Sequence, residues 1–401
     1  MRRKRPTIVD VAREAGVSIG TVSHVCNKSA RVRPNTRERV EAAMQRLAYR
    51  PNALARSLIG LAGDFDEVAR LQLPRLITVG YISLDFMARV DVMPHRDDRI
   101  TAHHIEKALG GPAANVAVAA AALGGNMALD VELATAIGDD PDSEWALAEL
   151  AQKGVHALPI RRPYHNRLSR CFVIVETNGR RTIINEPFEL TETDLAAHLP
   201  IAEESRPRCL HVEGYHVNRM QNTIARFRES GWKVSLHTTG LPAQSCNAHD
   251  FAALLVSHDL IFLNADTARA VLGLRAGLAD VVEAFTSYLS TCSNRGSVVL
   301  TLAEQGAAVF PASDAGPVRL AALPVEVVDA TGAGDTFAGV FLGLWLHGRD
   351  VIEAARYANV AAALAVTAEG AQARLTSLAE IERLLAIPSR PPARLGRVTC
   401  T

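Results

Sequence analysis

One glycine-rich turn directly before an apolar helix constrains this 401-residue chain more than any other feature. Residues 329–339 read DATGAGDTFAG, and the apolar side chains that follow have the i, i+3, i+4, i+7 spacing of one helical face. They are Phe337, Val340, Phe341, Leu344 and Trp345. A helix N-terminus offers N–H groups and the positive end of the helix dipole, which favour a bound phosphate, and glycines allow close approach to it.

Asp335 lies at the mouth of this predicted anion site, where a carboxylate is unfavourable unless its charge is used. Its simplest use is to accept the proton of a hydroxyl group that attacks phosphorus. A dinucleotide fingerprint does not fit, because its third glycine would fall at Phe337, and the chain has no G-x-x-x-x-G-K-[ST] segment. The alternative is a structural turn with an aspartate that caps a core helix.

The string DATGAGDTFAG closely resembles the C-terminal signature of the ribokinase family of sugar kinases, also called the PfkB family. The resemblance extends from Ile77 to about Leu385. It implies an α/β fold, with three α/β/α layers and a small β lid, and an ATP-dependent carbohydrate kinase that uses Mg²⁺. By the same resemblance Asp335 is the catalytic base. The implied site for the ATP phosphate is Gly332, Ala333 and Gly334.

A second signature, GGPAAN at residues 110–115, resembles the sugar-binding motif of the same family. We expect residues 76–86 to form one buried strand that ends in Asp85, whose carboxylate can accept hydrogen bonds from two sugar hydroxyls. The alternative is an ordinary turn aspartate. Strands around residues 89–105 and 171–184, with a turn at 178–179, are expected to form the lid and a dimer contact. The implied substrate-binding residues are Asp85, Gly110, Gly111 and Asn115.

The nucleotide side departs from the family pattern at three places. The motif N-x-x-E reads NADT at residues 264–267, which leaves Asp266 to supply the charge near magnesium. The motif T-L-G reads TLA and ends in Ala303. Arg374 falls where several members have a serine that helps to bind a monovalent cation, which argues against a K⁺ requirement. The resemblance assigns the nucleotide and magnesium region to Asn264, Asp266, Thr301, Gly306 and Asn359, and no metal ligand set is predicted directly.

The sugar itself is not specified, although ribose and ketose kinases resemble this chain more than adenosine kinases do. A cluster of arginines before a lid strand suggests a second anionic group, as on a phosphorylated ketose; the alternative is a solvated loop. These residues are Arg161, Arg162, Arg167 and Arg170.

The N-terminal residues 1–60 are basic, with 13 Lys and Arg against 4 Asp and Glu, although the whole chain has 43 of each kind. A basic head suggests nucleic acid as a partner. Thr7 and Asp10 fit a capping box, Gly16 breaks the first helix and Ser18 caps a second one. A third helix is expected to begin near Pro34, with Val40, Met44 and Leu47 on one face. Two short helices and a tight glycine turn are typical of a helix-turn-helix.

Residues 6–58 resemble the lac repressor (LacI) family of transcription factors. The resemblance implies an all-α domain that binds a near-palindromic double-stranded DNA operator as a homodimer. The second helix would enter the major groove, although His24 replaces the usual arginine, and Leu58 of a hinge helix would act as a wedge in the minor groove. The implied DNA-binding residues are Ile19, Gly20, Thr21, Ser23, His24, Asn52, Ala55 and Leu58.

We therefore expect a DNA-binding domain at 1–60, a linker at 61–75, a kinase domain at 76–388 and a flexible tail at 389–401. Six scattered cysteines, no signal peptide and no apolar run of about 20 residues indicate a cytoplasmic protein without a membrane partner. Two alternatives to a bifunctional kinase remain. The kinase-like domain senses a sugar, sugar phosphate or nucleotide without turnover, or the head is vestigial.

Overall fold

In a computed structural model the chain separates into two compact units, Met1–Gln72 and Leu73–Thr401. The structure describes residues 14–17, 34–46, 70–161, 167–177, 181–186, 190–199, 201, 205–274, 280–313 and 316–386. All of the predicted DNA-contacting residues, between Ile19 and Leu58, lie outside these ranges.

In the first unit, helix α3 (Pro34–Arg46) packs on the end of a preceding helix. Arg39 Nη2 donates to the carbonyl oxygen of Ala15 at 2.6 Å, and Val40 is fully buried. Gly16 has a φ of 62°, which glycine adopts without strain, and it ends the preceding helix. The predicted break at Gly16 and the predicted start near Pro34 are both confirmed.

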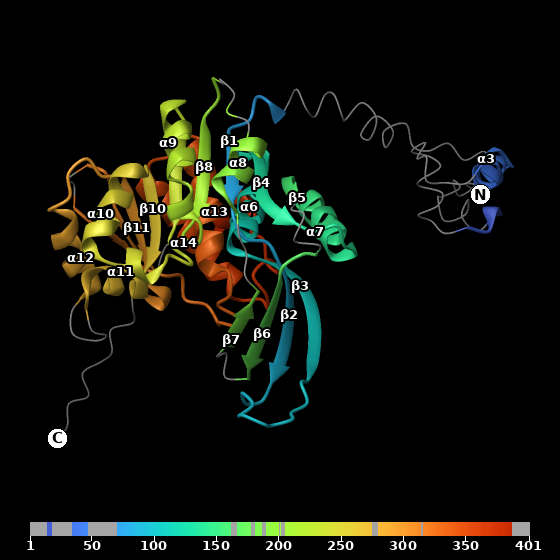
Figure 1. The fold of residues 1–401 in the computed structure, drawn as a ribbon, viewed down its shortest axis with the longest axis horizontal. Helices are drawn as coiled ribbons and strands as arrows, with labels where there is room; N and C mark the ends of the chain where they lie inside the picture. The colour runs from blue at the N-terminus through green and yellow to red at the C-terminus, as the bar shows by residue number, and fades with distance from the viewer. Residues whose placement is uncertain are drawn as a thin grey trace. The chain divides into compact units, whose positions relative to one another are not determined.

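The second unit is built on a nine-stranded sheet with the order β13-β12-β11-β10-β9-β8-β1-β4-β5 (Figure 1). Seven strands from β11 to β5 are parallel, and β12 and β13 add an antiparallel edge. The strands are β1 (Arg75–Val79), β4 (Asp130–Ile137), β5 (Val155–Arg161), β8 (Arg208–Glu213), β9 (Lys233–His237), β10 (Leu260–Asn264), β11 (Ser297–Thr301), β12 (Ala307–Phe310) and β13 (Val318–Leu320).

Helices cover both faces of this sheet because successive strand residues point to opposite sides. In β10, Phe262 joins one hydrophobic core, and Ile261 and Leu263 join the other. One face is covered by α6 (Pro112–Ala121), α7 (Pro141–Gln152), α13 (Ala333–Leu346), α14 (Val351–Ala365) and α15 (Leu378–Leu385). The other is covered by α8 (Glu192–His198), α9 (Gln221–Glu229), α10 (Ala248–Ser257), α11 (Ala265–Leu272) and α12 (Val281–Leu289). This arrangement confirms the predicted three-layer α/β/α fold.

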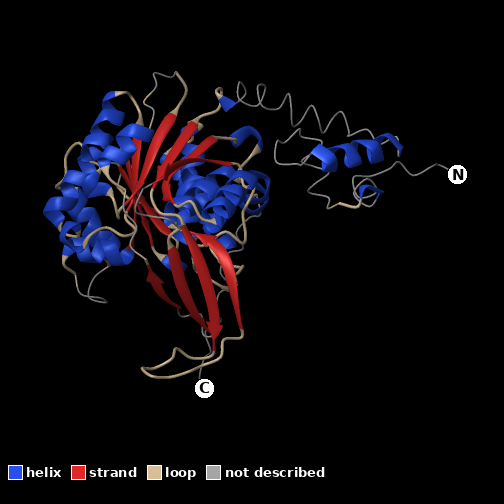
Figure 2. Ribbon diagram, turned by 45° about the vertical axis from the view of Figure 1, so that its right-hand side comes forward, coloured by secondary structure: helices blue, strands red, loops and turns tan. Residues whose placement is uncertain are grey.

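A four-stranded sheet with the order β3-β2-β6-β7 projects from the main sheet (Figures 1 and 2) and forms the predicted lid. Its strands are β2 (Ser83–Val90), β3 (His104–Gly110), β6 (Arg170–Glu176) and β7 (Arg181–Asn185). No helix in the described part of the chain is long and apolar enough to cross a membrane.

The predicted single strand at 76–86 is wrong, because the chain turns between β1 and β2. Gly80 has a φ of 148°, and a Cβ atom there would lie 2.2 Å from Cδ of Glu213. The turn places Asp85 within the lid strand β2, not at the end of the first strand of the main sheet. Likewise, residues 91–103 connect β2 to β3 and are not part of a strand.

Candidate active site

The glycine turn leads directly into α13, and Gly332 caps this helix with a left-handed backbone, φ 74°. Within the described ranges no side chain caps this end, so the N–H groups of the first turn remain suited to an anion. A Cβ atom at Gly332 would lie 2.6 Å from Cβ of Ala371. At Gly334, the same atom would meet only the ring of His237, at 3.5 Å. Close packing and φ therefore explain Gly332, whereas packing does not require Gly334.

A chain of hydrogen bonds connects four polar side chains beside the turn. Asn115 Nδ2 donates to Asp335 Oδ2 at 2.8 Å, and Gln372 Nε2 donates to Asn115 Oδ1 at 2.9 Å. Lys153 Nζ donates to Gln372 Oε1 at 2.7 Å. The structure thus brings together Asn115 and Asp335, two predicted residues from distant signatures, and fixes the orientation of the amide that contacts the carboxylate.

Close packing of α6 on α13 makes this contact possible, since each residue lies in the first turn of its helix. A Cβ atom at Gly339 would lie 2.4 Å from the backbone oxygen of Val116, a distance that real Cβ atoms do not adopt. Glycine at 339 therefore sets the separation of the two helices, and with it the distance between Asn115 and Asp335.

Asp335 is only 9% exposed, and burial raises the pKa of its carboxyl group. His237, the hydrogen bond from Asn115 and the charge of Arg181 act in the opposite direction. A raised pKa makes the carboxylate a stronger base near neutral pH. Burial lowers the pKa of His237, and the charge of Asp335 acts in the opposite direction; the imidazole Nδ1 lies 2.7 Å from Thr239 Oγ1.

Asp85 faces the glycine motif of residues 110–111. Its carboxylate accepts a short hydrogen bond from Ser83 Oγ, and burial raises its pKa to about 6. A Cβ atom at Gly110 would lie 1.9 Å from Asp85 Oδ2, so the missing side chain provides the space for this carboxylate. Gly111 has a φ of 101°, and a Cβ atom there would lie 2.3 Å from the carbonyl oxygen of Tyr81. These glycines are therefore required by backbone and carboxylate packing.

Glu213 and His237 are candidate functional residues that the sequence analysis did not assign. Each lies at the carboxyl end of a parallel strand, β8 or β9, which is where α/β sheets bind ligands. Glu213 Oε1 accepts from the backbone nitrogen of Tyr81 at 2.7 Å, and its buried Oε2 has no partner among the described residues. Burial raises the pKa of Glu213. Their position at strand ends was the signal that could have found them.

Another buried carboxylate, Asp329, anchors the start of the glycine turn. Its Oδ1 accepts from Thr331 N at 2.8 Å and from Thr331 Oγ1 at 2.6 Å. Its Oδ2 accepts from Gly370 N at 2.9 Å, which ties the turn to the loop after α14. Arg181 Nη1, on lid strand β7, lies 3.6 Å from Asp329 Oδ1. The carboxylates of Asp329 and Asp335 thus bracket the predicted anion site.

The residues predicted for the nucleotide side lie at the same sheet edge but are engaged locally. Asn264 Oδ1 caps α11 by accepting from Thr267 N at 2.8 Å. Asp266 is 93% exposed and pairs with Arg269 at 3.0 Å, so its carboxylate is not directed as a magnesium ligand. Thr301 ends β11. These positions do not converge on a preformed metal site.

The other two predicted nucleotide residues meet at one loop. Asn359 Nδ2 donates to the carbonyl oxygen of Ala321 at 2.6 Å. A Cβ atom at Gly306 would lie 2.0 Å from the carbonyl oxygen of Leu320, so glycine is required by this loop. Ala303 has a φ of 51°, which is unfavourable for alanine. The backbone thus retains a left-handed residue at the position where the family motif has glycine.

The arginine at the predicted monovalent-cation position, and the described arginines predicted to meet a second anionic group, form ion pairs or hydrogen bonds within the chain. Arg374 donates to Thr367 Oγ1 at 2.7 Å and to Glu380 Oε1 at 3.0 Å. In the arginine cluster, Arg161 pairs with Asp139 and Glu144, Arg167 with Glu186, and Arg170 with Asp142, whereas Arg162 lies outside the described residues. This pairing favours solvated side chains over a second anion site, but of the described arginines in the cluster only Arg167 lies in a loop, because Arg161 ends β5 and Arg170 begins β6.

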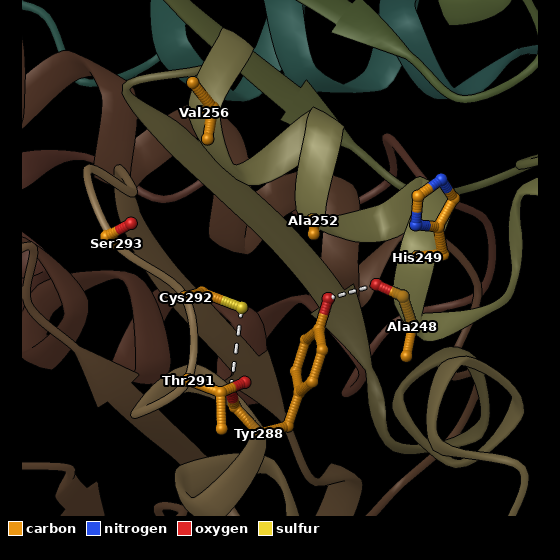
Figure 3. A pocket seen from close by; sticks show the side chains of 8 residues that line it. All are labelled: Ala248, His249, Ala252, Val256, Tyr288, Thr291, Cys292 and Ser293. Atoms are coloured by element: carbon orange, nitrogen blue, oxygen red, sulfur yellow. Dashed lines mark hydrogen bonds between the residues drawn. The ribbon is translucent and has the colours of Figure 1, made fainter.

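Two further features lie apart from this constellation. His104, Glu106 and Glu369 place ligand-type atoms within 4.8 Å of one another, but Glu369 already pairs with Arg89 at 2.9 Å. A surface pocket of about 420 Å³ lies between α10 and α12 (Figure 3), where Tyr288 Oη donates to the carbonyl oxygen of Ala248. No predicted site residue lines it, so it is not the candidate active site.

Comparisons with known proteins agree with this architecture. Residues 73–378 match the model of the pfkB family carbohydrate kinases, and residues 7–52 match the lacI family of bacterial regulatory proteins. The chain is 26% identical to an ATP-dependent ribose-1-phosphate kinase from Halopiger xanaduensis, over 76% of this chain and 95% of the relative. It is 28% identical to ribokinase from Bacillus subtilis, over 77% of this chain and 99% of the relative.

The N-terminal segment and the fold each have their own relatives. Catabolite control protein A from Priestia megaterium is 45% identical over 78 residues, which are 20% of this chain and 23% of that protein. Ribokinase from Arabidopsis thaliana, solved with ribose and ATP, shares the fold with a TM-score of 0.61 at 22% identity, over 78% of this chain and 99% of that one. The chain therefore belongs to the pfkB family of carbohydrate kinases and carries a lacI-family segment at its N-terminus.

Proposed function

We propose that this chain transfers the γ-phosphoryl group of ATP to a hydroxyl of a ribose- or ketose-type sugar, and that its N-terminal segment binds an operator. The main support for the kinase activity is the buried carboxylate of Asp335 in the first turn of α13. It accepts a hydrogen bond from Asn115 at 2.8 Å. A base and an anion-binding helix terminus lie within four residues of each other there. Phosphoryl transfer depends mainly on such positioning and on charge stabilisation.

In the proposed reaction, Asp335 accepts the hydroxyl proton as the sugar oxygen bonds to the γ-phosphorus. The bond from that phosphorus to the β,γ-bridging oxygen breaks, and ADP leaves with the electron pair. Gly332, Ala333 and Gly334 contribute N–H groups to the moving phosphoryl group. Mg²⁺ would neutralise charge on the nucleotide phosphates, but because Asn264 and Asp266 do not converge, no residue is assigned to it.

The proposed sugar site lies between the lid and the carboxyl edge of the main sheet. Asp85 supplies one acceptor for sugar hydroxyls, and Oε2 of Glu213, which has no partner in the described part of the chain, supplies another. Asn115 orients Asp335 and is held by Gln372. The paired arginines around residues 161–170 favour an unphosphorylated sugar, although one relative is named for ribose 1-phosphate.

The test is ADP release with ribose, fructose, other ketoses, adenosine and ribose 1-phosphate. Asp335→Asn should lower kcat by ~10²–10⁴-fold, because it removes the general base. Asp266→Asn is the matched control, since that carboxylate is 93% exposed and its loss should change kcat far less. Wild-type protein that releases no ADP with any of these acceptors contradicts catalysis.

The DNA-binding head is proposed to act as a dimer. The outer face of the lid offers a surface through which two chains could associate. Ile105, Phe172 and Ile184 share the outer lid face and are 67%, 54% and 58% exposed. Phe172→Glu should shift the sedimentation of the full chain from dimer to monomer and weaken operator binding. A monomeric wild type contradicts this arrangement.

A second candidate function is a regulator that binds its ligand without turnover. The exposed Asp266 and the alanine at 303 favour it, because both weaken the nucleotide side. It predicts that a sugar or nucleotide changes operator affinity in the absence of ADP release. Specific operator binding should also fall steeply with salt. Operator affinity that no ligand changes contradicts the regulator, and absence of any salt-dependent DNA binding leaves a kinase with a vestigial head.

A further inference from the structure

We propose that Arg181, on lid strand β7, is a catalytic residue that contacts the phosphoryl group during transfer. This inference rests on the proposed kinase function and adds a residue to it. Arg181 Nη1 lies 3.6 Å from Asp329 Oδ1. The arginine side chain is 34% exposed and the aspartate side chain 6% exposed, so a lid cation enters a largely buried acidic site.

The position of Asp329 connects Arg181 to the glycine turn. The oxygen that faces Arg181 also accepts from both the backbone nitrogen and the hydroxyl of Thr331, the residue before Gly332. A single residue, Asp329, therefore connects the guanidinium of Arg181 to the turn that forms the predicted anion site. Its charge also acts on Asp335, at the other end of the turn.

The negative charges at this site need a positive group to offset their repulsion. Asp329 and Asp335 are both buried and bracket the place where an anionic phosphoryl group would lie. Three negative groups in a site of low dielectric repel one another strongly unless a positive group lies among them. Guanidinium is the side chain that best matches phosphate geometry, through paired N–H donors.

Among the described residues, the other cations near this site are already engaged. Lys153 bonds Gln372, Arg89 pairs with Glu369 at 2.9 Å, and Arg374 bonds Thr367 and Glu380. The side chain of Arg181 makes no hydrogen bond to a described residue, and its ion pair of 3.6 Å is longer than the 2.7–2.9 Å typical of charge-assisted bonds. Its N–H donors therefore remain available to a phosphoryl oxygen.

Because Arg181 belongs to lid strand β7, its charge reaches the glycine turn from the sheet that covers the proposed sugar site. The sugar oxygen then bonds to phosphorus while ADP departs, as above, and Arg181 stabilises the charge spread over the equatorial oxygens. Stabilisation that is strongest in the transition state raises kcat more than it lowers the KM for the sugar.

The test compares Arg181→Ala, Arg181→Gln and Arg181→Lys with Arg89→Ala, a lid arginine on the same inner face that pairs with Glu369. Removing Arg181 should lower kcat by ~10²-fold or more and change the sugar KM by less than about threefold. By calorimetry with sugar present, both neutral variants should lose the preference of wild type for a non-hydrolysable ATP analogue over ADP. Lysine should restore part of it, and Arg89→Ala should keep it.

Several results overturn the proposal. One is an Arg181 variant that keeps both kcat and the ATP preference. Another is a variant that raises the sugar KM at unchanged kcat, which would place Arg181 on the sugar. If wild type binds ATP but releases no ADP, the proposed function fails, and the comparison of ATP with ADP still decides Arg181. Wild type that binds neither nucleotide contradicts both. Thermal unfolding within a few degrees of wild type shows that each variant is folded.

Discussion

The two halves of the candidate site are built differently. On the sugar side, Asn115 and Asp335 are buried and linked through Gln372 to Lys153 by hydrogen bonds of 2.7–2.9 Å. On the nucleotide side, Asn264 only caps its own helix, and Asp266 is 93% exposed. A buried network is costly to disturb, whereas exposed groups contribute little. The sugar side is therefore preorganised, and the nucleotide side must depend on the ligand that it binds.

The largest expected effect follows from breaking the buried side. Asn115→Ala removes the hydrogen-bond partner of Asp335 Oδ2 and of Gln372 Nε2, so kcat/KM for the sugar should fall by about 10²-fold or more. The free energy of unfolding should fall by about 1–3 kcal/mol. Both are measured by coupled ADP assays and denaturant titration.

Asn264→Ala is the matched control on the nucleotide side. It removes a helix cap, which costs ~1 kcal/mol, and should change kcat/KM for the sugar by less than tenfold. Equal losses in the two variants would contradict the difference between the two halves.

The next largest effect tests the spacing of α6 and α13. A Cβ atom at Gly339 would collide with the backbone oxygen of Val116 at 2.4 Å, so Gly339→Ala should destabilise the protein by about 1–3 kcal/mol despite the better helix propensity of alanine. At Gly343 the nearest atom, at 2.4 Å, is the flexible Cδ1 of Leu123. Gly343→Ala should therefore cost less in both stability and kcat, and a larger loss there would contradict this origin of the spacing.

The sequence predicted the layers and the glycine turn because each depends on local chemistry. Alternating apolar strands and a glycine before a helix produce the same pattern wherever they occur. It did not predict that Asp85 lies in the lid, because the turn at Gly80 depends on the distant Glu213 side chain. The sequence analysis did not assign Arg181 for a similar reason. Its position 3.6 Å from Asp329 depends on how the lid packs and not on local sequence.

The pH dependence should also separate the two halves. Asp85 has a pKa of about 6, so kcat/KM for the sugar should fall below about pH 6 as this acceptor is protonated, whereas KM for ATP should change little. The contribution of Asp85 to stability has the opposite pH dependence. The folded state binds this proton more tightly than the unfolded state, so the contribution of Asp85 to stability rises as pH falls from about 6 to 4.

Asp85→Asn tests this sign. The variant should melt above wild type near pH 7.5, where burying the charged carboxylate is unfavourable, and the difference should vanish near pH 4. A flat kcat/KM profile between about pH 5 and 7 would contradict the role of Asp85.

A smaller effect is expected from restoring charge on the nucleotide side. Thr267→Glu adds a carboxylate in the first turn of α11, where the helix dipole favours it, and should lower by a few-fold the Mg²⁺ concentration needed for half-maximal ADP release. Thr267→Gln has the same size without the charge and should leave this concentration unchanged. A response to both variants, or to neither, would contradict an electrostatic deficit at this position.

The smallest effect concerns the backbone of the nucleotide side. Ala303 has a φ of 51°, a conformation that costs an L-residue roughly 1–2 kcal/mol, and glycine removes that strain but loses more chain entropy on folding. Ala303→Gly should therefore raise the free energy of unfolding by about 0.5–1 kcal/mol. Asn294, at a φ of 54°, is the control, because asparagine tolerates this region and Asn294→Gly should gain less. If Ala303→Gly also lowers KM for ATP, the methyl group obstructs the nucleotide; if only stability changes, the weakness of this half lies in its exposed charges.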